Sequence, residues 1–221
     1  MPRADYEREL RALQRELVAL GSMVGKAVAK SVESLRNRDV ELAKNVISED
    51  ETIDRQRLTL EDHCEELVAT QQPLATDLRE VFSIFMIASE LERMGDYAKG
   101  IAKISIILAD QPFLKPLVDI PRMSSISIDM VKESIDAFIS RNVESAREVC
   151  ITDDEIDGLH DQVYRELLIL MIIDPKSIER ATYLLHVAHN LERVADRATN
   201  IAERAVYVAT GKMEEINTSK Y

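Results

Sequence analysis

The chain contains no tryptophan, and its six tyrosines and four phenylalanines make up only 5% of the sequence. Glycine and proline are also scarce, with six of each among 221 residues. A protein made of many short β-strands needs more turn residues than this, so the shortage argues against an all-β fold. Apolar residues nevertheless reach 46% of the chain, which is ample for a core built from aliphatic side chains.

Basic residues are outnumbered, because 28 Lys and Arg stand against 40 Asp and Glu, for a net charge of −12. The electrostatic field of a protein with this excess of negative charge repels phosphate backbones and anionic membranes, so we expect no nucleic-acid binding. The longest apolar run, Leu167 to Ile173, is too short to cross a bilayer, so no membrane insertion is expected. The N-terminal residues do not resemble a signal peptide. We interpret Cys64 and Cys150 as buried, reduced thiols of a cytoplasmic protein.

Apolar residues recur at three- and four-residue steps along nearly the whole chain, which predicts an all-α protein. Asp39 and Asn142 are expected to cap the second and fifth helices, and Gly211 to end the sixth. Prolines 112, 116 and 121 mark the one candidate linker. Residues 214–221 are expected to form a frayed tail. The six expected helices cover about residues 4–36, 40–71, 75–110, 122–140, 143–173 and 175–210.

The second half of the chain repeats the first. The segment Leu91–Ala102 returns 100 residues later as Leu191–Ala202, with Glu, Arg and Asp at the same spacing. Residues 31–54 likewise match residues 134–157. We therefore predict two tandem antiparallel three-helix bundles in an elongated molecule, with one repeat in residues 1–112 and the other in residues 113–221.

Each half carries two acidic pairs whose members are four residues apart and so share one helix face. In an antiparallel hairpin, residues equally far from the turn lie side by side. A turn near residue 73 therefore places the four acids of the first half at one level, and a turn at residues 174 and 175 does the same in the second half. Asp50 and Asp153 also lie on an apolar seam, so we expect them to be partly buried. The eight acids are Asp50, Asp54, Glu92, Asp96, Asp153, Asp157, Glu192 and Asp196.

Four clustered carboxylates cannot all stay ionised unless something neutralises them. Protons, Arg and Lys side chains, or metal ions could do so. Oxygen ligands without a thiolate suit Mg²⁺, Mn²⁺, Ca²⁺ or iron better than structural Zn²⁺. We therefore predict that the eight acids are metal ligands, and an interhelical ion-pair network is the alternative.

Two histidines could join the acids of the second half. His160 continues the acidic face of the fifth helix, and His189 precedes Glu192 by three residues on the sixth. The first half has Arg57 and Ser89 in the corresponding places. That asymmetry argues against an imidazole as a required ligand.

Small residues are expected beside both acidic sites. The same register places Gly21 and Gly25 of the first helix opposite Asp54 and Asp50. In the second half it places Ser124 and Ser125 near Asp157. These positions should leave room next to the carboxylates.

The sequence shows no Glu-x-x-His pair, no Gly-rich phosphate loop, and no Ser or Cys nucleophile at a recognisable spacing from a base. We therefore expect a protein that is not an enzyme and has no catalytic residues. Two alternatives remain open: a metal-free helical dimerisation scaffold, and a carboxylate-metal oxidase or hydrolase.

The doubled motif resembles the PhoU family over the whole chain. Its two copies read Glu92-Arg93-Met94-Gly95-Asp96-Tyr97-Ala98 and Glu192-Arg193-Val194-Ala195-Asp196-Arg197-Ala198-Thr199-Asn200-Ile201-Ala202, each preceded by a helix with an Asp-x-x-Ile-Asp pattern. The resemblance implies a cytoplasmic regulator of phosphate transport and phosphate homeostasis. The family motifs bind multinuclear metal clusters in some members, so the same eight acids are implied as ligands for divalent metal ions or multinuclear iron. Fe, Mn and Mg are the first candidates and Zn a further one.

The resemblance also implies partners. These are the ATP-binding subunit of the phosphate transporter and the phosphate-sensing histidine kinase, which such a protein regulates negatively when phosphate is plentiful. A homodimer is expected for helices as long and apolar as these. The family pattern usually has Asn four residues after the motif Asp, which Asn200 matches and Gly100 does not.

Overall fold

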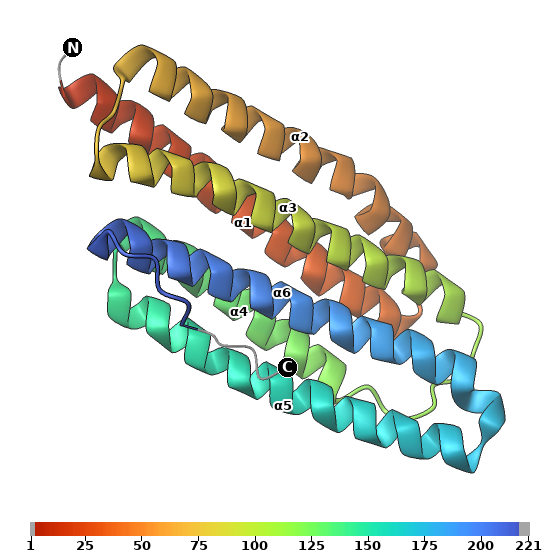
Figure 1. Ribbon diagram of the computed structural model, residues 1–221. Coiled ribbons are helices and arrows are strands. Elements are labelled where there is room, and N and C mark those ends of the chain that lie inside the picture. Colours follow the sequence, from red (N-terminus) through yellow and green to blue (C-terminus); the bar gives the residue numbers. More distant parts are fainter. Residues whose placement is uncertain (1–2, 217–221) are drawn as a thin grey trace.

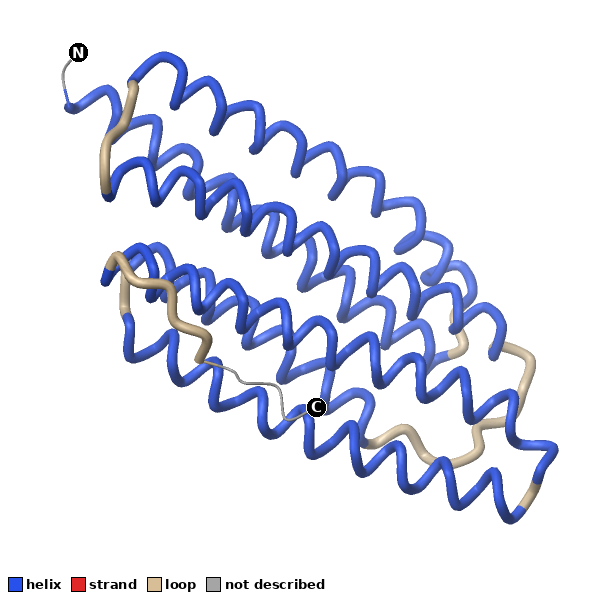
Figure 2. Tube along the Cα trace, viewed as in Figure 1, coloured by secondary structure: helices blue, strands red, loops and turns tan. Residues whose placement is uncertain are grey.

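The computed structural model describes residues 3–216, and in that range the chain is helical and has no β-strand (Figures 1 and 2). The all-α prediction is therefore confirmed. A 3₁₀ turn, η1, joins the last two helices at Pro175–Ser177. The six α-helices are α1 (Arg3–Asn37), α2 (Val40–Gln71), α3 (Thr76–Leu108), α4 (Asp119–Ser140), α5 (Val143–Ile173) and α6 (Ile178–Thr210).

The two predicted helix caps and the predicted end of the sixth helix are present in the structure. The Asp39 side chain accepts a hydrogen bond from the Leu42 amide at 2.9 Å and so caps α2. The Asn142 side chain caps α5 in the same way, by accepting from two backbone amides of the first turn. Gly211 ends α6 with φ +77°, a left-handed conformation that glycine adopts without strain.

Two local predictions were wrong. Helix α4 begins at Asp119, before the expected residue 122, because Pro121 lies in its first turn, where a proline needs no amide donor. The tail was expected to fray, but the Ile216 amide donates a hydrogen bond to Glu203 Oε1 at 2.8 Å, which holds residues 214–216 against α6. Residues 217–221 lie outside the described range.

The two halves form antiparallel three-helix bundles that lie side by side along their length (Figure 1). Helix α3 packs along α6, and α1 packs along α4. Helices α2 and α5 lie at opposite outer edges, where their described residues contact only helices of their own half. This arrangement confirms the predicted pair of bundles and the elongated shape.

One aliphatic core runs through both halves. Leu17 and Leu20 of α1, Leu91 of α3 and Leu191 of α6 are all fully buried within it. Each such side chain contributes about 1.5–3 kcal/mol of hydrophobic stabilisation. Because the core is continuous, the division predicted between residues 112 and 113, in the connection from α3 to α4, stays a prediction. None of the described helices has a stretch long and apolar enough to cross a membrane.

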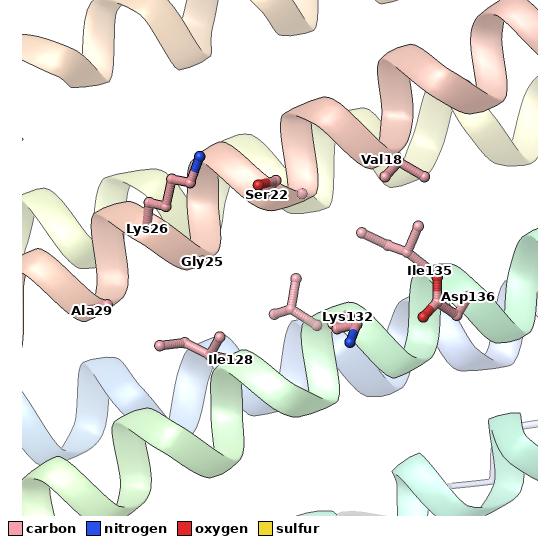
Figure 3. Close-up of a pocket in the computed structure, with 11 residues that line it drawn as sticks. Val18, Ser22, Gly25, Lys26, Ala29, Ile128, Lys132, Ile135 and Asp136 are labelled. Carbon is pink, nitrogen blue, oxygen red and sulfur yellow. The ribbon is translucent and has the colours of Figure 1, made fainter.

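The small residues of α1 face the other half of the molecule, which corrects a prediction. A Cβ atom on Gly21 would lie 2.3 Å from Ile135 Cδ1 of α4, and one on Gly25 would lie 3.5 Å from Ile128 Cγ2. Both glycines line a groove of about 490 Å³ between α1 and α4, flanked by Lys26 (Figure 3). They let these two helices approach each other, and the groove that they line includes none of the eight acids.

Ser124 and Ser125 are predicted to leave room beside Asp157, but the hollow that they line does not include that residue. Both serines line a second hollow between α4 and α1, together with residues such as Ala29 and Glu33. The face of α1 on which Gly21 and Gly25 lie was therefore predicted wrongly.

Candidate metal centres

The four acids of the first half meet where α2 packs on α3. Asp50 is buried, Asp54 and Glu92 are half-buried, and Asp96 is exposed. The pKa of the Asp54 carboxyl is raised, first because burial desolvates it and then because Asp50 and Asp96 carry like charge nearby. Burial also raises the pKa of Glu92, with further contributions from Asp96 and Asp54. The quartet predicted from the helix register is therefore brought together.

Two cations accompany these acids. Lys99 Nζ donates a hydrogen bond to Asp50 Oδ2 at 2.5 Å and lies 4.0 Å from Asp96 Oδ1. Arg57 donates to Glu61 at 2.6 Å, and this hydrogen bond is the main reason why its pKa is raised, with Glu92 adding to the effect. Sequence reasoning placed Arg57 on the acidic face, in the position of His160, but missed Lys99. The available signal was the position of Lys99 three residues after Asp96, one turn along the same helix face.

Three acids of the second half, Asp157, Glu192 and Asp196, lie close together between α5 and α6. Asp153 is buried, and Asp157, Glu192 and Asp196 are half-buried. Burial raises the pKa of Asp157, and the charges of Glu192 and Asp196 raise it further. Burial likewise raises the pKa of Asp196, although Arg193, which donates to it at 2.7 Å, opposes the shift.

The two histidines considered for this site do lie against its acids. His189 Nδ1 is 2.7 Å from Glu192 Oε2, and His160 Nδ1 is 3.9 Å from Glu192 Oε1. The centroids of the two imidazole rings are 6.2 Å apart. One potential ligand atom from each of these three residues lies within 4.8 Å of the other two, and no other such group occurs among the described residues.

Seven of the eight predicted ligands, all except Asp153, are therefore gathered into two clusters, but their oxygen atoms do not surround a single point. Within residues 3–216, no three of the acids bring their oxygen atoms within 4.8 Å of one another. Like charges keep the carboxylates apart, and Lys99 and Arg193 each hold one acid in an ion pair. An ion that bound here would draw the side chains inward by rotation about their χ angles.

Arg193 connects the second acidic cluster to the first half of the molecule. Besides its contact with Asp196, it shares the hydroxyl of Tyr97, on α3, with Arg197. Burial raises the pKa of the Tyr97 hydroxyl, but hydrogen bonds from the two arginines outweigh burial, so that the pKa is lowered. The contact between α3 and α6 is therefore polar at this level.

The position that follows each motif by four residues also lies at this contact. Asn200 donates a hydrogen bond to Glu90 of α3 at 3.3 Å. A Cβ atom on Gly100 would lie 3.0 Å from Asn190 Nδ2 of α6. Gly100 replaces the usual Asn of the family pattern at a point where α3 and α6 pack closely. The absence of a side chain there affects the packing between these two helices.

Comparisons with a family model and with known proteins all match the same family. The model of the family described as "PhoU domain" matches residues 17–105 and 120–205. A protein of Clostridium acetobutylicum named phosphate-specific transport system accessory protein PhoU homolog is 36% identical over 98% of this chain and 100% of its own length. A protein of Aquifex aeolicus with the same name is 41% identical, over 93% of each chain.

Solved structures resemble the fold equally well. The crystal structure of PhoU from Pseudomonas aeruginosa has a TM-score of 0.89 and 32% identity, and covers 94% of this chain and 100% of that one. The crystal structure of the phosphate transport system regulatory protein PhoU from Streptococcus pneumoniae has a TM-score of 0.89 and 31% identity, and covers 95% and 99% of the two chains.

Proposed function

The chain belongs to the PhoU family, and on that premise we propose that it is a cytoplasmic accessory protein that restrains phosphate uptake and phosphate-starvation signalling. The observation that carries the proposal is the family match to both repeats, together with relatives named as phosphate-specific transport accessory proteins over nearly their whole length. On this proposal the chain is an adaptor and not a catalyst.

The adaptor acts by docking on two partners, the ATP-binding subunit of the phosphate transporter and the phosphate-sensing histidine kinase. Exposed apolar side chains support a docking role, because such side chains gather where proteins meet. Ile169, Ile172 and Ile173 at the end of α5 are 56%, 74% and 73% exposed, respectively, and Ile178 at the start of α6 is 48% exposed. A homodimer remains part of the proposal, and light scattering of the purified protein would measure the oligomeric state.

The two acidic clusters bind divalent metal ions or multinuclear iron, with Fe, Mn and Mg as the first candidates and Zn as a further one. The donor set supports this: it consists mainly of carboxylate oxygens, which hard cations prefer. The raised pKa values support it too, because they show that the folded protein favours neutralisation of these acids. A bound cation would supply that neutralisation and would hold α2 to α3, and α5 to α6.

The experiment for the regulatory role is genetic. Deletion of the gene should derepress phosphate-starvation genes in phosphate-rich medium, and the wild-type chain should restore repression. A variant with Ile172→Glu and Ile173→Glu should fail to restore repression and should no longer retain the transporter ATPase or the kinase in a pull-down. Ile151→Glu is a matched control, because Ile151 is 69% exposed on the same helix away from this end. Unchanged gene expression after deletion would reject the role.

A metal-free scaffold is the second candidate, and the ion pairs favour it. Lys99 already neutralises Asp50, and Arg193 already neutralises Asp196. Elemental analysis of protein purified without chelator decides between the two. Metal-free protein whose melting temperature does not respond to Mn²⁺ or Mg²⁺ would leave the ion-pair network as the explanation for the acidic clusters.

A further inference from the structure

The second acidic cluster differs from the first in the chemistry of its donors. His160 of α5 and His189 of α6 both direct Nδ1 toward the carboxylate of Glu192, at 3.9 and 2.7 Å. Imidazole nitrogen suits Zn²⁺, Co²⁺ and Ni²⁺, whereas Mg²⁺ and Ca²⁺ favour oxygen alone. Two nitrogens and one oxygen therefore point to a different class of ion from the one that an all-carboxylate site would take.

The first cluster has no histidine in the two equivalent places. Arg57 occupies the position of His160, and its guanidinium stays protonated and cannot bind a metal ion. Ser89 occupies the position of His189 and offers only a hydroxyl. Lys99 of the first cluster corresponds to Thr199, whose hydroxyl donates to the backbone carbonyl of Asp196 and carries no charge. Both clusters contain a paired cation, Lys99 in the first and Arg193 in the second, but only the second cluster contains imidazoles.

The distances suit a small coordination sphere. Ligand atoms bound at about 2.0–2.1 Å in a tetrahedral site lie about 3.3–3.4 Å from one another. The two nitrogen-to-oxygen distances at Glu192 lie on either side of that value, and all three donors are within 4.8 Å of one another. The His189 side chain is 55% exposed, so an ion can reach the site from solvent. Asp157 and Asp196 carry charge close to Glu192 and would add to the attraction for a cation.

We propose that His160, His189 and Glu192 bind a divalent transition-metal ion of the zinc, cobalt and nickel class, so that the second repeat takes a different class of ion from the first. The three side chains supply three ligands, and a water or a neighbouring carboxylate completes the site. The inference rests on the proposed function only in assigning metal ions to the second cluster. It needs neither the transporter subunit nor the kinase.

The test uses the full chain, stripped with chelator and then freed of it. Calorimetric titration with Zn²⁺ measures the affinity, and the visible absorption of added Co²⁺ reports the number and type of ligands. His160→Ala with His189→Ala should weaken Zn²⁺ binding by at least about tenfold and change the Co²⁺ spectrum. His186→Ala is the matched control, because His186 is exposed on the same helix outside the cluster, and it should behave as the wild type. Binding of Mn²⁺ by the first cluster should be the same in all three proteins.

Unchanged Zn²⁺ affinity and an unchanged Co²⁺ spectrum in the double variant would overturn the inference and leave the histidines as simple charge partners of Glu192. Wild-type protein that binds Mn²⁺ but not Zn²⁺ would also overturn it, while the proposed carboxylate sites would stand. Protein that binds none of these ions would refute both metal proposals, and the deletion phenotype would still test the regulatory role separately.

Discussion

Neutralising one acid of the second cluster should make the metal-free protein more stable. Asp157 faces Glu192 and Asp196 across the contact between α5 and α6, and its pKa is raised by burial and by those two charges. A raised carboxyl pKa means that the ionised form is less favourable in the folded state than in the unfolded chain. Asp157→Asn removes that unfavourable charge and retains the size of the side chain.

The magnitude follows from the number of neighbours. Each like-charge contact between half-buried side chains costs a few tenths of a kcal/mol, and desolvation adds to that cost, so the variant should gain about 0.5–1 kcal/mol. For a chain of 221 residues this corresponds to a rise in Tm of about 1–4 °C.

The gain should depend on pH with a definite sign. The pKa of Asp157 in the folded protein is higher than its ordinary value of 3.8, so the folded state binds this proton more tightly than the unfolded chain does. The wild type is therefore stabilised as the pH falls through the raised pKa, and it loses that stability as the pH rises through the same value. The difference between variant and wild type should therefore be largest near neutral pH and should shrink as the pH approaches 3.8.

Thermal unfolding in the presence of a chelator, followed by circular dichroism across that pH range, measures the effect. Glu148→Gln is the matched control, because it removes one negative charge from an exposed position on the same helix. With saturating Zn²⁺ the order should reverse, because Asp157 belongs to the cluster proposed to bind this ion and a ligand at 100 times its Kd stabilises the wild type by about 2.7 kcal/mol. A variant that is less stable than the wild type in chelator near pH 7 would refute the reasoning, and so would a difference that does not change with pH.

Three further outcomes are expected. Arg141→Ala leaves Glu80, which is 1% exposed, without the guanidinium that pairs with it across the two halves, and should cost about 2–4 kcal/mol in urea denaturation. Glu80→Gln should cost less, and equal losses would contradict the argument. Cys64 and Cys150 are buried, and desolvation raises the pKa of each thiol to about 12, so both should react with a disulfide reagent only after unfolding. Leu20→Ala should cost about 2–5 kcal/mol, because Leu20 is fully buried in the shared core, and a loss below 1 kcal/mol would argue against that packing.

The features that sequence reasoning predicted depend on local chemistry or on counting. Asp39 and Asn142 cap helices because of interactions within a single turn of the chain, which a sequence shows directly. The meeting of Asp54 with Asp96 follows from a constant rise per residue on two antiparallel helices that share a turn. The caps require no knowledge of how a helix is rotated about its own axis, and the apolar seam that includes Asp50 indicates the rotation of α2.

The features that were missed depend on that rotation. Gly21 was placed at the level of Asp54, but it faces Ile135 of α4 because the second bundle packs against that side of α1. No pattern within one repeat encodes the approach of the other repeat. Lys99 was missed for a related reason, since a long side chain on α3 reaches Asp50 of α2 across a contact that only the packed structure defines.

The two acidic clusters show how a duplicated module can diverge without losing its fold. A Cβ atom added at Gly95 would lie 3.3 Å from the Ile53 side chain and 3.5 Å from Asp50 Oδ1. The second repeat has the fully buried Ala195 at the corresponding position. The first cluster is thus closely packed around Asp50 and carries a lysine beside it. The second exchanges that lysine for the uncharged Thr199 and adds imidazoles at its rim. Since the acids at corresponding positions are the same, the proposed difference in cation preference rests on these neighbours, and substitutions at the histidines test it more directly than substitutions at the acids.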